Sequence, residues 1–98
     1  MTNLLEKINY MQRQVIVQSY LYYERDYNVW SDKKYDAFCR KLVALKEEHP
    51  DLWIQSEYYK QFKNEYDGTT GFYLYHELDD RQKEIIKVIA NYAIKNNL

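Results

Sequence analysis

Apolar side chains recur every three or four residues over the first part of the chain, which is the spacing of a helix with one buried face. The stripe consists of Leu4, Ile8, Met11, Val15 and Tyr22. Thr2 or Asn3 has the short polar side chain of an amino-terminal cap. Gln12 and Gln18 fall between the apolar positions, so we expect them to face water. The pattern predicts a long helix over about residues 3–26.

A second stripe follows after a short break in the pattern. Ser31 has the side chain of a helix cap, and Asp32 would lie in the first turn, where the helix dipole favours an anion. The apolar positions that follow are Tyr35, Phe38, Cys39, Leu42 and Leu45. Pro50 ends this helix, because the residue before a proline avoids the helical conformation. The sequence therefore predicts a second helix over 32–48, antiparallel to the first.

The signal weakens after Pro50. We expect a loop or short turn over residues 51–55, then a short helix capped by Ser56 and running to Tyr66. Residues 67–71 contain both glycines of the chain and predict a turn or an exposed loop. Residues 72–75 are too few to separate a strand from the start of a helix.

Asp79 and Gln82 have the spacing of a capping box, which predicts a closing helix that runs to about Lys95. We therefore expect an all-α fold in one domain of 98 residues. Residues 1–52 would form a long antiparallel hairpin. One or two helices in the Tyr-rich segment 53–98 would complete it.

Composition excludes several classes of protein. The net charge is −1, whereas a dedicated nucleic-acid binder normally has a basic excess. Cys39 is the chain's single cysteine, so an internal disulfide and a multi-thiolate zinc site are ruled out. His49 and His76 lack the spacing of a metal motif, and we expect no metal. The chain has neither a signal-peptide pattern nor an apolar run of membrane-spanning length, so we expect a cytoplasmic protein.

Tyrosine is the unusual component, at 12 of the 98 residues. Tyr22 and Tyr23 lie near the end of the first predicted helix. Asp32 and Asp36 lie one turn apart on the second helix, with Tyr35 beside them. Aromatic rings and carboxylates together suit a flat cationic or amide-bearing ring that carries ribose hydroxyls. The alternative is that Tyr22 and Tyr35 are core residues while the aspartates only stabilise a helix start.

A resemblance to a known family runs through these positions. It rests on Tyr22-Tyr23, Asp26, Trp30-Ser31-Asp32-Lys33-Lys34-Tyr35-Asp36, Leu42, Leu45 and Glu48-His49-Pro50-Asp51-Leu52, within residues 13–52. This order and spacing resemble the amino-terminal Ia domain of bacterial NAD-dependent DNA ligases, which holds the nicotinamide mononucleotide half of NAD. The resemblance implies that Tyr22 and Tyr23 contact this nucleotide and that Tyr35 lines its ring. Asp32 and Asp36 would bind the carboxamide and the ribose.

The chain departs from the ligases in the residues that carry catalysis. The adenylated lysine of that family lies in a Lys-x-Asp-Gly motif, whereas this chain has Glu65-Tyr66-Asp67-Gly68. Without the lysine there is no covalent AMP intermediate, so we expect no enzyme. The sequence predicts a non-catalytic module that binds nicotinamide mononucleotide or NAD, or that acts in trans on another NAD-using protein.

A protein-interaction module, such as a phage-encoded inhibitor or adaptor, is the competing hypothesis. Exposed aromatic side chains rimmed by acids would form the contact surface. The residues of this surface would be Tyr58, Tyr59, Phe62, Tyr66, Phe72, Tyr73 and Tyr75.

Overall fold

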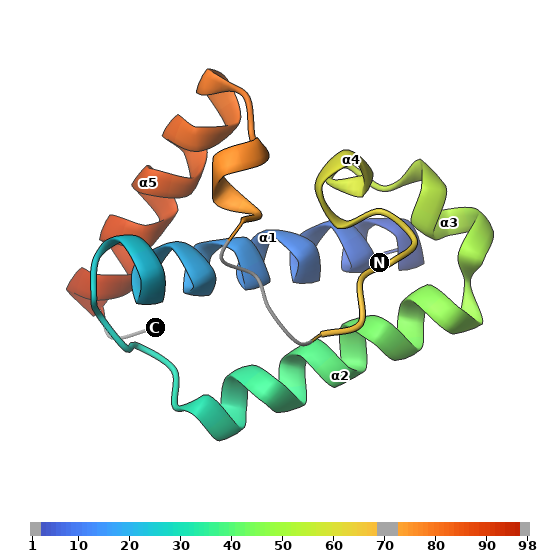
Figure 1. Ribbon diagram of the computed structural model, residues 1–98, viewed down its shortest axis with the longest axis horizontal. Coiled ribbons are helices and arrows are strands. Elements are labelled where there is room, and N and C mark those ends of the chain that lie inside the picture. The colour runs from blue at the N-terminus through green and yellow to red at the C-terminus, as the bar shows by residue number, and fades with distance from the viewer. Residues whose placement is uncertain (1–2, 69–72, 97–98) are drawn as a thin grey trace.

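The computed structural model describes residues 3–68 and 73–96, and these residues form helices and no strand (Figure 1). The elements in chain order are α1 (Leu4–Glu24), α2 (Asp32–Glu48), α3 (Pro50–Gln55), α4 (Tyr59–Phe62), the 3-10 helix η1 (Tyr75–Glu77) and α5 (Asp80–Asn96). Helices α1 and α2 run antiparallel, and α5 packs against α1. The all-α prediction is confirmed.

The two long helices begin at side-chain caps that the sequence predicted. The Asn3 side chain accepts a hydrogen bond from the Glu6 N–H at 2.8 Å, and Ser31 does the same for Lys34 at 3.1 Å. The chain leaves α1 through Asp26, whose φ of 49° is a left-handed conformation that aspartate tolerates better than most residues.

The region after Pro50 differs from the prediction. Residues 50–55 form helix α3 and not a loop, because proline at the first position of a helix has a suitable φ and no N–H that needs a partner. Ser56 does not cap the short helix that the sequence predicted up to Tyr66, since α4 begins at Tyr59 with no side-chain cap. The Ser56 hydroxyl donates to the Trp53 carbonyl at 2.6 Å, at the end of α3. Helix α4 is a single turn that ends where Lys63 takes a φ of 58°.

Helix α1 is the centre of the molecule. Every residue from Val15 to Leu21 is buried, because α2, α3, η1 and α5 all contact this helix. Gln12 and Gln18 are therefore buried too, and their predicted exposure is wrong. The Gln12 amide is satisfied by partners distant in sequence, the Ser56 hydroxyl at 2.8 Å and the Tyr58 N–H at 3.3 Å.

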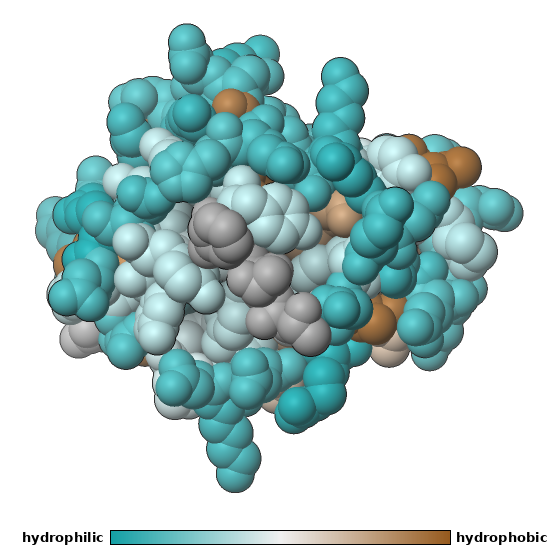
Figure 2. Space-filling model, viewed as in Figure 1, coloured by the Kyte–Doolittle hydropathy of each residue, from teal (hydrophilic) through white to brown (hydrophobic). Residues whose placement is uncertain are grey.

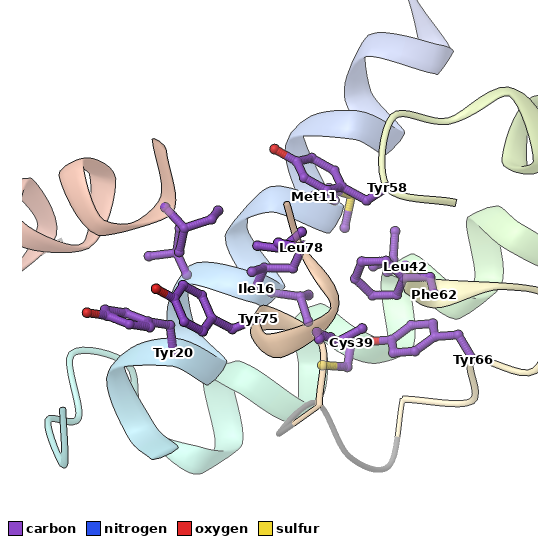
Figure 3. Close-up of a cluster of buried hydrophobic side chains, with 14 of the residues drawn as sticks. Met11, Ile16, Tyr20, Cys39, Leu42, Tyr58, Phe62, Tyr66, Tyr75 and Leu78 are labelled. Carbon is purple, nitrogen blue, oxygen red and sulfur yellow. The ribbon is translucent and has the colours of Figure 1, made fainter. Parts of the chain in front are cut away.

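Several aromatic residues of the Tyr-rich segment lie in the core, so their expected exposure is wrong, while an interaction role for the chain stays a hypothesis. Tyr58, Phe62, Tyr66 and Tyr75 are buried, and their rings point into the cluster shown in Figure 3. Tyr59 and Tyr73 are half-buried, and Phe72 lies outside the described residues. A small chain gains core from large side chains, so these rings fill the space beside α1.

The surface is polar over the face that Figure 2 shows, where apolar side chains are scattered. None of the helices in the described ranges has the length and apolar character that a bilayer-spanning segment requires. Within residues 3–68 and 73–96 there is also no cluster of three or more His, Cys, Asp or Glu arranged to hold a metal ion.

Candidate functional site

A pocket of about 280 Å³ lies where the hairpin turns, between the end of α1 and the start of α2. It is lined by Gln18, Ser19, Tyr22, Tyr23, Tyr27, Asn28, Trp30, Asp32, Tyr35 and Asp36. All five residues that the sequence analysis proposed for a ligand are among them, so the fold brings them together as expected. Their role in binding stays a prediction.

The α1 wall consists of Gln18, Ser19, Tyr22 and Tyr23. These residues are three to four positions apart in pairs, so they share one face of the helix. Tyr22 and Tyr23 are each 51% exposed, and their rings meet edge to face at 4.8 Å between centroids. The alternative that Tyr22 is a core residue is therefore wrong, and its ring is accessible to a ligand.

The α2 wall carries the two carboxylates. Asp32 and Asp36 are both exposed and lie one turn apart on the pocket side of the helix. Asp32 also lies in the first turn of α2, where it stabilises the helix start. A role of Asp32 at the start of α2 and a role in the pocket are therefore compatible, since a residue in the first turn can also face the pocket.

Tyr35 connects α2 to α1 through a side-chain hydrogen bond. Its hydroxyl and that of Ser19 on α1 form a hydrogen bond of 2.8 Å. Burial of the half-buried Tyr35 ring raises the pKa of its hydroxyl well above the usual range, and the nearby Cys39 thiol adds to this effect. The hydroxyl is neutral at pH 7, as that of any ordinary tyrosine is, so the negative charge of the pocket comes from Asp32 and Asp36.

The loop between the helices contributes lining residues that the sequence analysis missed: Tyr27, Asn28 and Trp30. The Trp30 ring packs against Phe38 with centroids 4.9 Å apart, and the Lys34 ammonium lies over it at 4.7 Å. Gln18 and Ser19 also line the pocket. They lie one helical turn before Tyr22 and Tyr23, so helical spacing identifies them as lining residues. The loop residues have no periodicity, so no comparable signal existed for them.

These features define a class of protein, a small helical domain with an open pocket of aromatic rings and two carboxylates at the turn of a hairpin. The chain belongs to the family described as the DNA ligase-like, N-terminal NAD+-binding domain, whose family model matches residues 1–60. The resemblance inferred from the sequence is confirmed.

Curated relatives match the same part of the chain. A DNA ligase of Desulfitobacterium hafniense is 33% identical over 52 residues, which are 53% of this chain and 8% of that protein. A DNA ligase of Roseiflexus sp. is 38% identical over 50 residues, which are 51% of this chain and 7% of that protein. The chain thus corresponds to only a small part of the length of these ligases. No solved structure matches the chain.

Proposed function

We propose that the pocket between α1 and α2 binds the nicotinamide mononucleotide part of NAD. One observation carries this proposal. The five residues that the ligase resemblance implies for this ligand all line one open pocket, in a chain whose family is an NAD+-binding domain. They are Tyr22, Tyr23, Asp32, Tyr35 and Asp36.

The chemistry of the lining supports specific roles. The exposed rings of Tyr22 and Tyr23 offer flat apolar faces on which a nicotinamide ring stacks. The carboxylates of Asp32 and Asp36 accept hydrogen bonds from a carboxamide N–H and from ribose hydroxyls. The pocket volume of about 280 Å³ is at the lower end for small-molecule sites, so it suits the nicotinamide and ribose and not a whole dinucleotide.

We further propose that this chain binds the nucleotide without performing catalysis, either to hold it or to act in trans on another NAD-using protein. The Asp-Gly sequence that resembles part of the ligase nucleophile motif ends at a bend of the chain, which supports a structural role for it. Gly68 has a φ of 83°, and a Cβ there would lie 3.5 Å from the Cys39 Cβ. Glu65 replaces the nucleophilic lysine, and the adjacent Tyr66 is buried.

Titration of the chain with nicotinamide mononucleotide, by calorimetry or NMR, tests the binding proposal. We expect Tyr22→Ala and Asp36→Ala each to weaken binding by roughly 1–3 kcal/mol, through a lost stacking contact or charge-assisted hydrogen bond. Tyr10→Ala is the matched control, because Tyr10 is a similarly exposed tyrosine (55%) on α1 that lies outside the pocket.

The outcome separates the two hypotheses for this chain. Absence of binding at millimolar nucleotide, or equal losses for Tyr10→Ala and Tyr22→Ala, would contradict the proposal. A protein-interaction role would then be the remaining hypothesis, although four of its seven predicted contact residues are buried.

A further inference from the structure

We infer that two copies of this chain associate through the outer face of α5, with the two helices antiparallel. The inference does not depend on the proposed function, because no residue of α5 lines the pocket between α1 and α2. It rests on an exposed apolar stripe along α5 and on the charged residues at the edge of that stripe.

Helix α5 is apolar on two sides. The helix packs against α1, and its buried side consists of Ile86, Ala90 and Ala93. On the opposite side Ile85, Val88 and Tyr92 are 41%, 62% and 61% exposed. These three residues are three and four positions apart, so they form one continuous stripe along the helix, the outer stripe of α5. Packing against α1 therefore does not account for them.

The surface around the outer stripe is hollowed as well as apolar. A shallow depression there is lined by five residues that all belong to α5: Arg81, Glu84, Ile85, Val88 and Ile89. Helix α5 lies along one edge of the molecule (Figure 1), which leaves this side open to another chain. Contiguous exposed apolar side chains with polar residues at their rim are typical of a contact site for a protein.

Two charged residues at the edge of the stripe indicate which protein binds there. Glu84 and Lys95 are both exposed, and neither forms an ion pair within the described residues. They are eleven residues apart, which is close to three helical turns, so they lie on the same edge and roughly 16 Å apart along the axis. This edge is therefore negative at one end and positive at the other.

A second copy of the chain complements this pattern when its α5 runs in the opposite direction. Glu84 of each copy then lies near Lys95 of the other copy, and Val88 packs beside Tyr92 of the other copy. Both contacts occur twice, because the contact is symmetric. A parallel arrangement would place Glu84 beside Glu84 and Lys95 beside Lys95, which is unfavourable. Charge therefore selects the antiparallel dimer.

Sedimentation equilibrium of the full chain measures this association. The outer stripe is small compared with a stable protein interface, so we expect a reversible dimer with a dissociation constant between about 10 μM and 1 mM. We expect Val88→Glu to stay monomeric over this range, because it places two carboxylates in the apolar contact. Ile54→Glu is the matched control, since Ile54 is 55% exposed on α3 and lies outside the outer stripe.

Reversal of charge tests the antiparallel order. Glu84→Lys and Lys95→Glu should each raise the dissociation constant about fivefold or more, because each change turns two attractive contacts into repulsive ones. The double variant Glu84→Lys, Lys95→Glu should restore the affinity of the original chain, since every pair is again of opposite charge. Circular dichroism checks that each variant keeps its helices.

Three results would overturn the inference. They are a chain that stays monomeric at 1 mM, a dimer that is equally stable in Val88→Glu, and a double variant that dimerises no better than the single charge reversals. None of these results bears on nucleotide binding, which is measured separately.

Discussion

Two buried tyrosines differ in what their hydroxyl groups contact. Tyr58 is 2% exposed, and its hydroxyl accepts a hydrogen bond from Arg13 Nε at 3.2 Å. Tyr66 is 3% exposed, and its hydroxyl has no hydrogen-bond partner within the described residues. Burial raises the pKa of Tyr66, and the Cys39 thiol adds to this effect. A buried polar group without a partner costs stability.

The substitutions Tyr66→Phe and Tyr58→Phe should therefore have different effects. We expect Tyr66→Phe to leave the free energy of unfolding unchanged or to raise it by about 1 kcal/mol, because it removes an unsatisfied hydroxyl. Tyr58→Phe should lower it by about 1–2 kcal/mol, because it leaves the Arg13 guanidinium short of an acceptor. Urea denaturation measures both. Equal destabilisation by the two variants would contradict this account.

At the scale of single helices, the closing helix has the capping box that its sequence predicted. The Gln82 N–H donates to Asp79 Oδ1 at 2.7 Å, and the Asp79 N–H donates to Gln82 Oε1 at 3.1 Å. The two bonds satisfy backbone donors that an uncapped helix leaves without partners. Short signals of this kind were reliable because both partners lie within one turn.

Replacing Asp79 with alanine should destabilise the chain through α5. We expect a loss of about 1 kcal/mol in the free energy of unfolding, the usual cost of losing a side-chain cap. Asp80→Ala is the control, because Asp80 is in the first turn of the same helix and should contribute only a few tenths of a kcal/mol through the helix dipole. Thermal or urea unfolding would refute the prediction if both variants lost the same stability.

The sequence predicts the structure poorly where a residue suits two structures or where its partner is distant in the chain. Pro50 predicts the end of α2, but the same residue also begins α3. The local pattern places Gln12 at the surface and cannot reveal its partner Ser56, which lies 44 residues further along. The pocket was largely predictable, since helical register alone places Asp32 with Asp36 on one side of α2.

At the scale of the whole molecule, the hairpin depends on the segment that follows it. More than half of the buried hydrophobic residues in the described ranges come from residues 53–96. In α2 only Cys39 and Leu42 are buried, so the hairpin alone covers little apolar surface. Tyrosine content did not reveal this dependence, because a tyrosine suits both a core and a binding surface.

A fragment of residues 1–52 should therefore not fold on its own. It keeps α1 and α2 but lacks Trp53, Tyr58 and Phe62, which are at most 2% exposed in the full chain. We expect the full chain to unfold cooperatively on heating and the fragment to show no cooperative transition by circular dichroism. A cooperative melt of the fragment would show that the hairpin is self-sufficient.

The carboxyl end of α1 forms one wall of the pocket. Residues that lie outside the family match contact this end of the helix on the side away from α2. Glu24 contacts His76, Arg25 donates to the Asn91 side chain at 3.0 Å, and the Tyr20 ring packs on Tyr75 at 4.5 Å. A protein engineer who transplants residues 1–60 alone would move the ligand-facing groups without the brace that aligns them. Any host scaffold must therefore supply a replacement support at this end of the helix.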